Sequence, residues 1–413
     1  MLADNYLEKF LSWQEEFQPS EYLLACSGGC DSAVLLRVLF EIKEKLTAPV
    51  RVVYINHGWS EYAESWGMAV EKMAADCGFS FFAVRLNLSA NQNAEAVARA
   101  ARYRVFSENL SERGVLLTAH HQDDQAETFL INLLRASGLD GLSAMPKRKK
   151  FGLGEHWRPF LDISRAEIEE FARARNLQFV EDPSNADEKY LRNRIRKSVL
   201  APLNDLQATR QIAKAAELLA DARMAQEYFF DGIVGSERDL HLSKIRTCPE
   251  YLQLSLIRYW LAKNNLPPPP NKRLCEFVRQ VWTSELYCQM TYAEKIILKN
   301  REKLQILPEK NPATVPKFNI DTHWEGIGRL KILDARDEFL EKEISWHLFP
   351  IQGRFLSQDG KSEKIKELFR KKQIAPILRR RLPILRIDGE IAWIGDIGNS
   401  RKFPDLKIVW EKE

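Results

Sequence analysis

The chain contains 413 residues, of which 45% are hydrophobic and 29% are charged, and its formal net charge is +4. This length predicts two or three domains, and the composition excludes an intrinsically disordered protein because enough apolar residues are present to form a core. No apolar run is long enough to span a membrane, and the acidic stretch 1–17 lacks the features of a signal peptide, so we expect a cytoplasmic protein.

The six cysteines are scattered along the chain, with no C-x-x-C pair and no close cluster of cysteine and histidine. Structural zinc sites and iron–sulfur sites usually need such clusters, so neither is expected here. Scattered thiols in a chain of this length are typical of a reducing compartment.

Residues 22–25 predict a buried strand, residues 33–40 predict a helix, and the stretch C-S-G-G-C-D-S at 26–32 lies between them. Glycines let the backbone approach an anion, and the first free N–H groups of a helix point towards it. Asp31 would repel a polyphosphate unless a cation lay between them, which indicates Mg²⁺. The stretch lacks the lysine of a Walker loop. It predicts a phosphate-binding loop of another type, against the alternative of a surface turn that precedes a helix.

Further strands are predicted at 51–57, 79–88 and 115–120, and helices at 61–77, 94–110 and 123–135. Strands that alternate with helices at this spacing predict an α/β domain with a doubly wound parallel sheet. Such sheets bind ligands beyond the carboxyl ends of their strands. We therefore expect Ser27, His57 and His120, each at or just after a strand end, to converge on one crevice.

His57 and the charged face of the helix predicted at 94–110 could each have a structural role instead of a role in ligand binding. His57 could make only a structural hydrogen bond at its strand end, or its neutral or protonated imidazole could contact a nucleotide phosphate. Glu95, Arg99 and Arg102 share one face of the predicted helix. That face could be solvated and ion-paired, or the arginines could be directed at phosphates. The spacing leaves both alternatives open.

Two histidines and three acids lie within residues 120–127, where a strand meets a helix. Acids at a helix N-terminus stabilise the helix dipole, which is one explanation of the pattern. Asp124 and Glu127 are three residues apart on one helical face, so together they could also bind a substrate ammonium group. A metal site is a further alternative, although the absence of a nearby cysteine argues against tightly bound zinc.

In combination these segments resemble the tRNA(Ile)-lysidine synthetases, within the ATP-pyrophosphatase (PP-loop) family. The resemblance is carried by residues 27–32, 55–58, 95–103, 118–128, 133–142, 158–161, 181–185 and 190–196. It implies an adenine nucleotide alpha hydrolase-like domain with ATP and Mg²⁺ as cofactors, the metal being held by Asp31. The residues implied to bind ATP are Ser27, Gly28, Gly29, Cys30, Asp31 and Ser32.

The resemblance also implies the reaction. Free L-lysine is ligated to C2 of the wobble cytidine of tRNA(Ile) with a CAU anticodon, which gives lysidine. The cytidine is first adenylated with release of pyrophosphate, and lysine then displaces AMP. Asp31, His57 and Arg102 are implied to be catalytic, and Asp124 and Glu127 to recognise lysine.

Two basic segments complete the first domain. Residues 137–158 contain four glycines and the run K-R-K-K at 147–150, which predicts a mobile loop near the crevice, either solvated or in contact with RNA phosphates. Residues 192–197 place four cations on a short helix. By charge this helix could equally face solvent or RNA, and the resemblance favours tRNA contacts by Arg192, Arg194 and Arg196.

The second half predicts helices at 206–232, 241–261 and 273–281, strands within 286–307, and a proline-rich linker at 308–316. The predicted domains are a PP-loop catalytic domain (1–205), a mainly helical tRNA-binding domain (206–310) and a small α+β tRNA-binding domain (311–413).

A basic stretch in the last domain, residues 361–386, is the clearest candidate for an RNA footprint. Part of it, 371–385, resembles the C-terminal domain of the lysidine synthetases. Such a run is usually a solvated face, but the implied substrate favours tRNA binding by Arg379, Arg380 and Arg381.

Two other functions would leave different features in the sequence. A different PP-loop enzyme, such as an iron–sulfur tRNA thiolase or an amidotransferase-coupled synthetase, would need cysteine pairs or a glutaminase signature, and neither is present. A non-catalytic RNA-binding protein with a decayed nucleotide site would be favoured if Asp31 or the second glycine of the loop were missing. No protein partner is evident, and a homodimer is compatible with the sequence.

Overall fold

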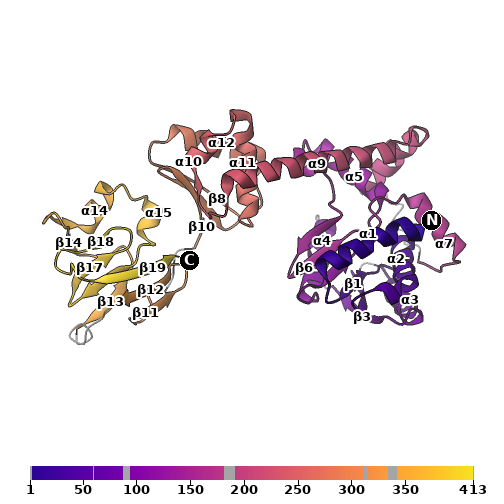
Figure 1. Ribbon diagram of the computed structural model, residues 1–413, viewed down its shortest axis with the longest axis horizontal. Helices are drawn as coiled ribbons and strands as arrows, with labels where there is room; N and C mark the ends of the chain where they lie inside the picture. The colour runs from indigo at the N-terminus through magenta and orange to yellow at the C-terminus, as the bar shows by residue number, and fades with distance from the viewer. Residues whose placement is uncertain are drawn as a thin grey trace. The chain divides into compact units, whose positions relative to one another are not determined.

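The computed structural model describes residues 2–58, 60–86, 94–180, 191–310, 312, 314–333 and 342–412. The chain divides into two compact units, Met1–Gln226 and Glu227–Glu413, and helix α9 (Ala208–Val234) contributes residues to both. Figure 1 shows the elements of each unit. The predicted domain boundaries at residues 205 and 310 stay a prediction.

A six-stranded sheet forms the centre of the first unit, with the strand order β3-β2-β1-β4-β6-β5 (Figure 1). The strands are β1 (Tyr22–Ala25), β2 (Val50–Asn56), β3 (Ser80–Arg85), β4 (Val115–Leu117), β5 (Arg148–Phe151) and β6 (Gly154–Trp157). The helices before α9 are α1 (Leu2–Phe17), α2 (Cys30–Glu41), α3 (Ala63–Asp76), α4 (Ala94–Glu108), α5 (Gln122–Leu134), α6 (Leu139–Leu142), α7 (Arg165–Ala174) and α8 (Leu191–Ile195). Neighbouring strands are parallel except β5, which runs antiparallel to β6. The predicted doubly wound parallel sheet is confirmed, with one antiparallel edge strand added.

Alternate residues of the central strand β1 enter different cores. Tyr22 and Leu24 pack in the larger core with side chains of α1, α2, α3 and α7. Leu23 packs on the other face with Phe106 and Leu110. Tyr22, Leu23 and Leu24 are fully buried. Helices therefore cover both faces of this strand, which is why its sequence is continuously apolar rather than alternating.

The segment between α5 and α7 differs from the mobile loop predicted over 137–158. It forms α6 and the strands β5 and β6, and β6 pairs in parallel with β4. Gln125 fixes the turn before β5, because its side-chain amide donates to the carbonyl of Met145 at 2.8 Å and its oxygen accepts from the Met145 N–H at 2.9 Å. Each strand has only four residues, one of them glycine in β6, which is why the sequence pattern did not predict them.

The second unit begins with the end of α9, which packs with three helices and a four-stranded sheet of order β7-β10-β9-β8. The helices are α10 (Leu242–Arg246), α11 (Glu250–Lys263) and α12 (Asn271–Thr283). The strands are β7 (Leu240–His241), β8 (Tyr287–Tyr292), β9 (Lys295–Asn300) and β10 (Lys303–Pro308). The helical middle segment and its strands are as predicted. The continuous helix predicted over 241–261 is wrong, because Pro249 lacks an N–H donor and stands at the N-cap of α11.

The rest of the second unit is a small α+β part, as predicted, with a three-stranded sheet, a four-stranded sheet and a hairpin of β14 and β15. The three-stranded sheet contains β11 (Asp321–Trp324), β12 (Gly328–Leu333) and β19 (Lys407–Lys412). The four-stranded sheet contains β13 (Ile344–His347), β16 (Ile384–Ile387), β17 (Glu390–Ile394) and β18 (Gly398–Asn399). The remaining elements are β14 (Arg354–Leu356), β15 (Ser362–Lys364), α14 (Ile365–Lys371) and α15 (Pro376–Arg379). Within the described residues, no helix has the length and apolarity needed to cross a membrane.

Trp157, at the end of β6, is the centre of an aromatic cluster. Its ring centroid lies 5.6 Å from those of Phe10 and Trp13 and 6.1 Å from that of Tyr22, and the side chain is fully buried. We predict that Trp157→Ala lowers the free energy of unfolding of the first unit by about 3–5 kcal/mol, because it leaves a large cavity. Urea unfolding followed by circular dichroism measures this loss. Leu153→Ala in the adjacent turn, at a side chain that is 74% exposed, should change stability by less than about 0.5 kcal/mol; equal losses would contradict the assignment of the core.

Candidate active site

The loop that follows β1 turns sharply at Gly28. Its φ of +86° lies in the left-handed region that favours glycine. A Cβ atom here would lie 3.1 Å from Val70 Cγ2 and 3.4 Å from Val180 Cγ2, so the loop is also closely packed. Gly29 follows as the extended N-cap of α2. The first N–H groups of α2 therefore point back into the loop, as binding of an anion requires.

The hydroxyls of this loop lie together at the start of α2. Ser27 Oγ is 3.3 Å from Ser32 Oγ, and Ser32 Oγ donates to the Gly29 carbonyl at 3.0 Å. The Cys30 side chain instead packs against the main core, and burial raises its pKa to about 11. Cys30 can therefore serve a nucleotide through its backbone N–H, whereas its thiol does not face the crevice.

The ends of β1, β2 and β4 meet at a crevice of about 200 Å³. Ser27 lines it from the loop after β1, His57 from the end of β2 and His120 from the end of β4, so the predicted convergence is confirmed. Further polar residues that line it are Asp31, Ser32, Arg99, Arg102, Thr118 and Asp124. The crevice thus combines hydroxyl donors, cations and carboxylates at the carboxyl edge of a parallel sheet, where such folds bind their ligands.

Arginines of α4 give the crevice its positive charge. Arg102 is half-buried, and Arg99 lines the crevice from an exposed position with its guanidinium 5.1 Å from the centre of the Tyr103 ring. We therefore favour arginines directed at phosphates over a solvated, ion-paired helix face. The side chain of Glu95 lies outside the described residues. Burial and the charge of Arg102 lower the pKa of His57 to about 4, so this imidazole is neutral at pH 7.

His121 is a residue of the site that the sequence did not single out. Its Nε2 lies 3.7 Å from Asp31 Oδ2 and 3.5 Å from Asp124 Oδ2, and its Nδ1 lies 3.6 Å from Asp123 Oδ2. Burial lowers the pKa of His121, but the nearby carboxylates of Asp123, Asp124 and Asp31 outweigh burial and raise it. An imidazole flanked by acids at a helix start was the signal that could have identified it.

Asp31 and Asp124 are the two carboxylates that line the crevice. Burial raises the pKa of Asp31, and the charge of His121 offsets part of this rise. Burial acts in the same direction on Asp124, but the charge of His121 and the hydrogen bond that Asp124 accepts from the His121 N–H lower its pKa overall, so it is ionised at pH 7. Among the described residues, no group of three or more His, Cys, Asp or Glu side chains could hold a metal ion. One or two carboxylates do suit Mg²⁺ when substrate phosphates supply the remaining ligands, so the site fits that cation.

Glu127 does not have the position predicted for a lysine-binding residue. Its side chain is fully buried, with Oε1 2.7 Å from Arg196 Nε and Oε2 3.5 Å from Arg192 Nε. It does not line the crevice, whereas Asp124 does. Glu127 thus contacts Arg192 of α8 and Arg196 of the π-helix that follows (Arg196–Leu200), and the prediction that it binds lysine together with Asp124 stays a prediction.

Three family models match the chain: a PP-loop domain over residues 2–203, a TilS substrate binding domain over 240–285 and a TilS substrate C-terminal domain over 352–409. The chain is 32% identical over 398 residues to the tRNA(Ile)-lysidine synthase of Xanthomonas campestris pv. campestris, covering 92% of this chain and 91% of that protein. It is 31% identical over 411 residues to the tRNA(Ile)-lysidine synthase of Methylococcus capsulatus, covering 91% of each. The chain belongs to the tRNA(Ile)-lysidine synthase family.

This membership confirms the resemblance found in the sequence and makes the protein an ATP-using enzyme with a PP-loop domain. Among solved structures, the U34-tRNA thiolase NcsA from Methanococcus maripaludis is similar over 48% of this chain and 72% of its own, with 19% identity and a TM-score of 0.41. The lysidine synthase assignment rests on the sequence relatives.

Two of the three arginines predicted to bind tRNA from α8 and the π-helix that follows it have another partner in this chain. Arg192 and Arg196 form the ion pairs with Glu127, and each keeps about a third of its side chain exposed (34% and 36%). Arg194 is exposed. Arg194 is thus the best placed of the three for RNA, and the other two act first as partners of a buried carboxylate.

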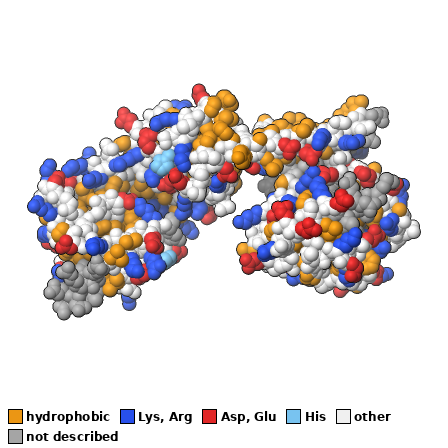
Figure 2. All heavy atoms as spheres, viewed as in Figure 1, with side chains coloured by type: hydrophobic (Ala, Val, Ile, Leu, Met, Phe, Trp, Pro, Cys, Tyr) orange, Lys and Arg blue, Asp and Glu red, His pale blue; other side chains and the backbone are white. Residues whose placement is uncertain are grey.

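The three consecutive arginines of the second unit, residues 379–381, also differ in exposure and in their partners. Arg381 is buried, and its guanidinium donates to the carbonyls of Pro308 and Lys310. These contacts give Arg381 a structural role, and its predicted role in tRNA binding stays a prediction. Arg379 is partly buried, with Nε donating to the Ile374 carbonyl at 3.0 Å, and Arg380 is exposed. On the face shown in Figure 2, basic side chains are interspersed with acidic ones.

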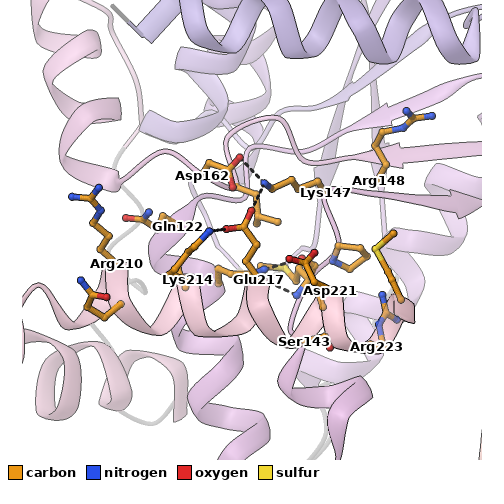
Figure 3. Close-up of a pocket in the computed structure, with 18 residues that line it drawn as sticks. Gln122, Ser143, Lys147, Arg148, Asp162, Arg210, Lys214, Glu217, Asp221 and Arg223 are labelled. Carbon is orange, nitrogen blue, oxygen red and sulfur yellow. Dashed lines mark hydrogen bonds and ion pairs between the residues drawn. The ribbon is translucent and has the colours of Figure 1, made fainter. Parts of the chain in front are cut away.

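A second cavity, of about 770 Å³, lies beside the first half of α9 (Figure 3). Lys147 points into it, with Nζ 2.9 Å from Asp162 Oδ2 and 3.1 Å from Glu217 Oε1. Lys214 Nζ lies 2.6 Å from the other oxygen of Glu217. The lysines of this cavity already share their charge with two acids, so it is a poorer phosphate site than the crevice. Its ion pairs connect this part of α9 to the rest of the first unit.

Gly28 offers a test of the loop geometry. We predict that Gly28→Ala lowers the free energy of unfolding by at least about 1–2 kcal/mol, because alanine in the left-handed region is strained and its Cβ would press on Val70. ATP affinity should fall with it. The matched control is Gly29→Ala, where the backbone is extended and the nearest atom to a Cβ, Ser27 Oγ, is 3.6 Å away. Thermal unfolding and ATP titration compare the two variants, and equal stability losses would contradict the predicted strain.

The neutral state of His57 leads to a pH prediction. NMR titration should give His57 a pKa near 4, and Arg102→Gln should raise this pKa without restoring 6.5, because burial is the larger cause. Between about pH 4 and 6.5 the unfolded state binds more protons at this residue than the folded state, so His57 makes stability rise with pH in that window. His57→Gln should show a shallower rise in urea unfolding over the same range. A His57 pKa of 6.5 or higher would contradict the prediction.

Proposed function

We propose that this protein joins free L-lysine to C2 of the wobble cytidine of tRNA(Ile) with a CAU anticodon, which forms lysidine, and that ATP activates the cytidine. The single crevice that unites the PP-loop with Arg102 and Asp124 is the observation that carries the proposal. Relatives named tRNA(Ile)-lysidine synthase, which match over most of the chain, support lysidine formation on this tRNA.

The first step activates a poor leaving group. The O2 atom of the cytidine attacks the α-phosphorus of ATP, the bond from that phosphorus to the bridging oxygen breaks, and pyrophosphate leaves. The loop N–H groups with Ser27 and Ser32 bind the phosphate oxygens. Arg102 stabilises the negative charge that develops on the α-phosphate, and the neutral imidazole of His57 adds a hydrogen bond there.

The second step forms the carbon–nitrogen bond. The ε-amine of lysine attacks C2, the bond from C2 to O2 breaks, and AMP leaves with that oxygen on its phosphate. Asp124 is ionised and lines the crevice, so it is our choice for binding the ammonium group of lysine. The ε-ammonium must lose a proton before it attacks, and a carboxylate of the crevice accepts that proton.

Asp31 is our choice for the Mg²⁺ ligand. When bound, the cation supplies the positive charge that lets a carboxylate stand beside the phosphates of ATP. Burial raises the pKa of Asp31, so a nearby cation would favour its ionised form.

The surface arginines are proposed to hold the tRNA backbone. Arg194 of the first unit and Arg379 with Arg380 of the second unit are at least partly exposed, so they can reach phosphates. Arg192 and Arg196 keep partial exposure and are proposed to contribute weakly, because their ion pairs with Glu127 compete for the same groups.

The two steps can be separated with labelled substrates. The protein is mixed with unmodified tRNA(Ile) bearing the CAU anticodon, Mg²⁺ and ATP labelled at the α-phosphate, first without lysine. We predict that label enters the tRNA as pyrophosphate is released. Labelled lysine added afterwards should enter the tRNA as AMP is released. Asp31→Asn should slow both steps by about 100-fold or more.

Asp124→Asn distinguishes the two steps. It should leave adenylation near the normal rate and raise KM for lysine about tenfold or more, as expected for loss of one charge-assisted hydrogen bond of roughly 1.5–3 kcal/mol. Asp76→Asn, at an exposed aspartate of α3, is the matched control and should change neither step. Incorporation of lysine without a preceding labelled tRNA would contradict the two-step order, and an Asp124 variant with normal KM would exclude that residue from lysine binding.

A further inference from the structure

A row of buried polar side chains leads from the end of β6 to the crevice. Arg158 Nη2 lies 3.1 Å from His156 Nδ1, and His156 Nε2 lies 2.8 Å from Thr118 Oγ1. Thr118 Oγ1 then lies 2.6 Å from Nδ1 of His120, which lines the crevice. Arg158, His156 and Thr118 are 3%, 0% and 7% exposed. Parallel pairing of β4 with β6 brings the row together, since Leu116 lies opposite His156.

Each group in this row donates to the next one, from Arg158 towards His120, because Arg158 can only donate. A guanidinium group can only donate, so His156 Nδ1 accepts from Arg158 and the proton of this imidazole is on Nε2. That proton is donated to Thr118 Oγ1. Among the hydrogen bonds of the described residues, Thr118 Oγ1 has no acceptor other than His120 Nδ1, so this buried hydroxyl donates its proton there and His120 Nδ1 accepts. The proton of His120 is then on Nε2, the nitrogen that the row does not use.

Burial, reinforced by nearby arginines, keeps both imidazoles neutral. Burial lowers the pKa of His120 to about 3; the charge of Asp124 opposes this, and those of Arg158, Arg99 and Arg192 reinforce it. Burial and Arg158 likewise place the pKa of His156 far below its ordinary value. The guanidinium of Arg158 is itself fixed, because its Nη1 donates to the carbonyl of Pro146 at 2.7 Å.

We propose that Arg158, His156 and Thr118 are positioning residues that hold His120 in its neutral Nε2–H form, so that His120 presents a hydrogen-bond donor to the crevice and acts neither as a base nor as a cation. The inference rests on the proposed function, since the acceptor is an oxygen of the reacting phosphate or of the cytidine. The row fixes which ring nitrogen carries the proton and the plane in which the ring lies.

A neutral donor suits this position. The Nε2–H group can stabilise an oxygen on which negative charge develops during transfer of the AMP group. It adds no positive charge next to Arg99 and Arg102, which line the same crevice. It also keeps the same protonation state throughout the range between about pH 5 and about pH 8, where a histidine without such partners would change its charge.

The protonation state of His120 can be measured in the wild-type protein. Protein with nitrogen-15-labelled histidine, examined by two-dimensional NMR between about pH 5 and about pH 8, should show His120 with its proton on Nε2 and no change over that range. The resonances are assigned by loss in His120→Gln. A proton on Nδ1, or titration of His120 within that range, would overturn the proposal.

A pair of substitutions tests the role of the row in catalysis. Thr118→Val removes the hydroxyl with little change of shape, whereas Thr118→Ser keeps it. We expect kcat for lysidine formation to fall about 10- to 100-fold in the valine variant, which is the usual loss when the partner that orients a functional histidine is removed. KM for ATP should change little, and the serine variant should recover most of the activity. His120 in Thr118→Val should show a mixture of ring tautomers by NMR.

A second pair keeps the test independent of Thr118. His156→Gln can still accept from Arg158 and donate to Thr118, whereas His156→Phe can do neither. Activity should be higher in the glutamine variant. Equal activities within both pairs, with normal folding by circular dichroism, would overturn the proposed role. If the wild-type protein formed no lysidine, the proposed function would be wrong, and the protonation state of His120 would still be decided by NMR.

Discussion

Parallel pairing of β1 with both β2 and β4 is the constraint on which the site depends. The register places Tyr22 opposite Val50 on one side and opposite Val115 on the other. The backbone hydrogen bonds of these strands hold their carboxyl ends level, so the segments that follow them open at one edge. Ser27, His57 and His120 are far apart in the sequence and share one crevice for this reason. The left-handed turn at Gly28 then directs the start of α2 towards the same space.

Charge is distributed unevenly around the crevice. The cations Arg99 and Arg102 come from α4, whereas the carboxylates Asp31 and Asp124 come from the starts of α2 and α5. The crevice therefore offers cations that suit phosphates as well as carboxylates that suit a metal cation or an ammonium group. Behind the carboxylates, His121 lies within 4 Å of three aspartates, which limits the cost of bringing acids together in a buried place.

Cations that are adjacent in the sequence have different roles in the structure. Arg148, in the run predicted to be a basic loop, packs 5.3 Å from the centre of the Trp157 ring and forms ion pairs with Glu16 and Glu155. Arg381 binds backbone carbonyls in the interior of the second unit. Arginine can do this because its long apolar stem packs against other side chains while its planar head binds several acceptors. A run of positive charge in the sequence is therefore not by itself an RNA footprint.

The sequence by itself determined the doubly wound sheet, the phosphate-binding loop and the convergence of three strand ends, because these depend on local patterns and on the general geometry of parallel sheets. It also singled out Asp124 and Arg102, and both line the crevice. The tertiary structure decided which neighbouring residues face the crevice. Asp124 faces it and Glu127 does not, since the latter is one helical turn further and meets Arg192 and Arg196, which come from a distant segment.

The direction of the hydrogen bonds from Arg158 to His120 likewise depends on the pairing of β4 with β6, and β6 was too short for its pattern to be recognised. Contacts between segments that are distant in the chain have no local signal, which is why only the folded structure reveals them.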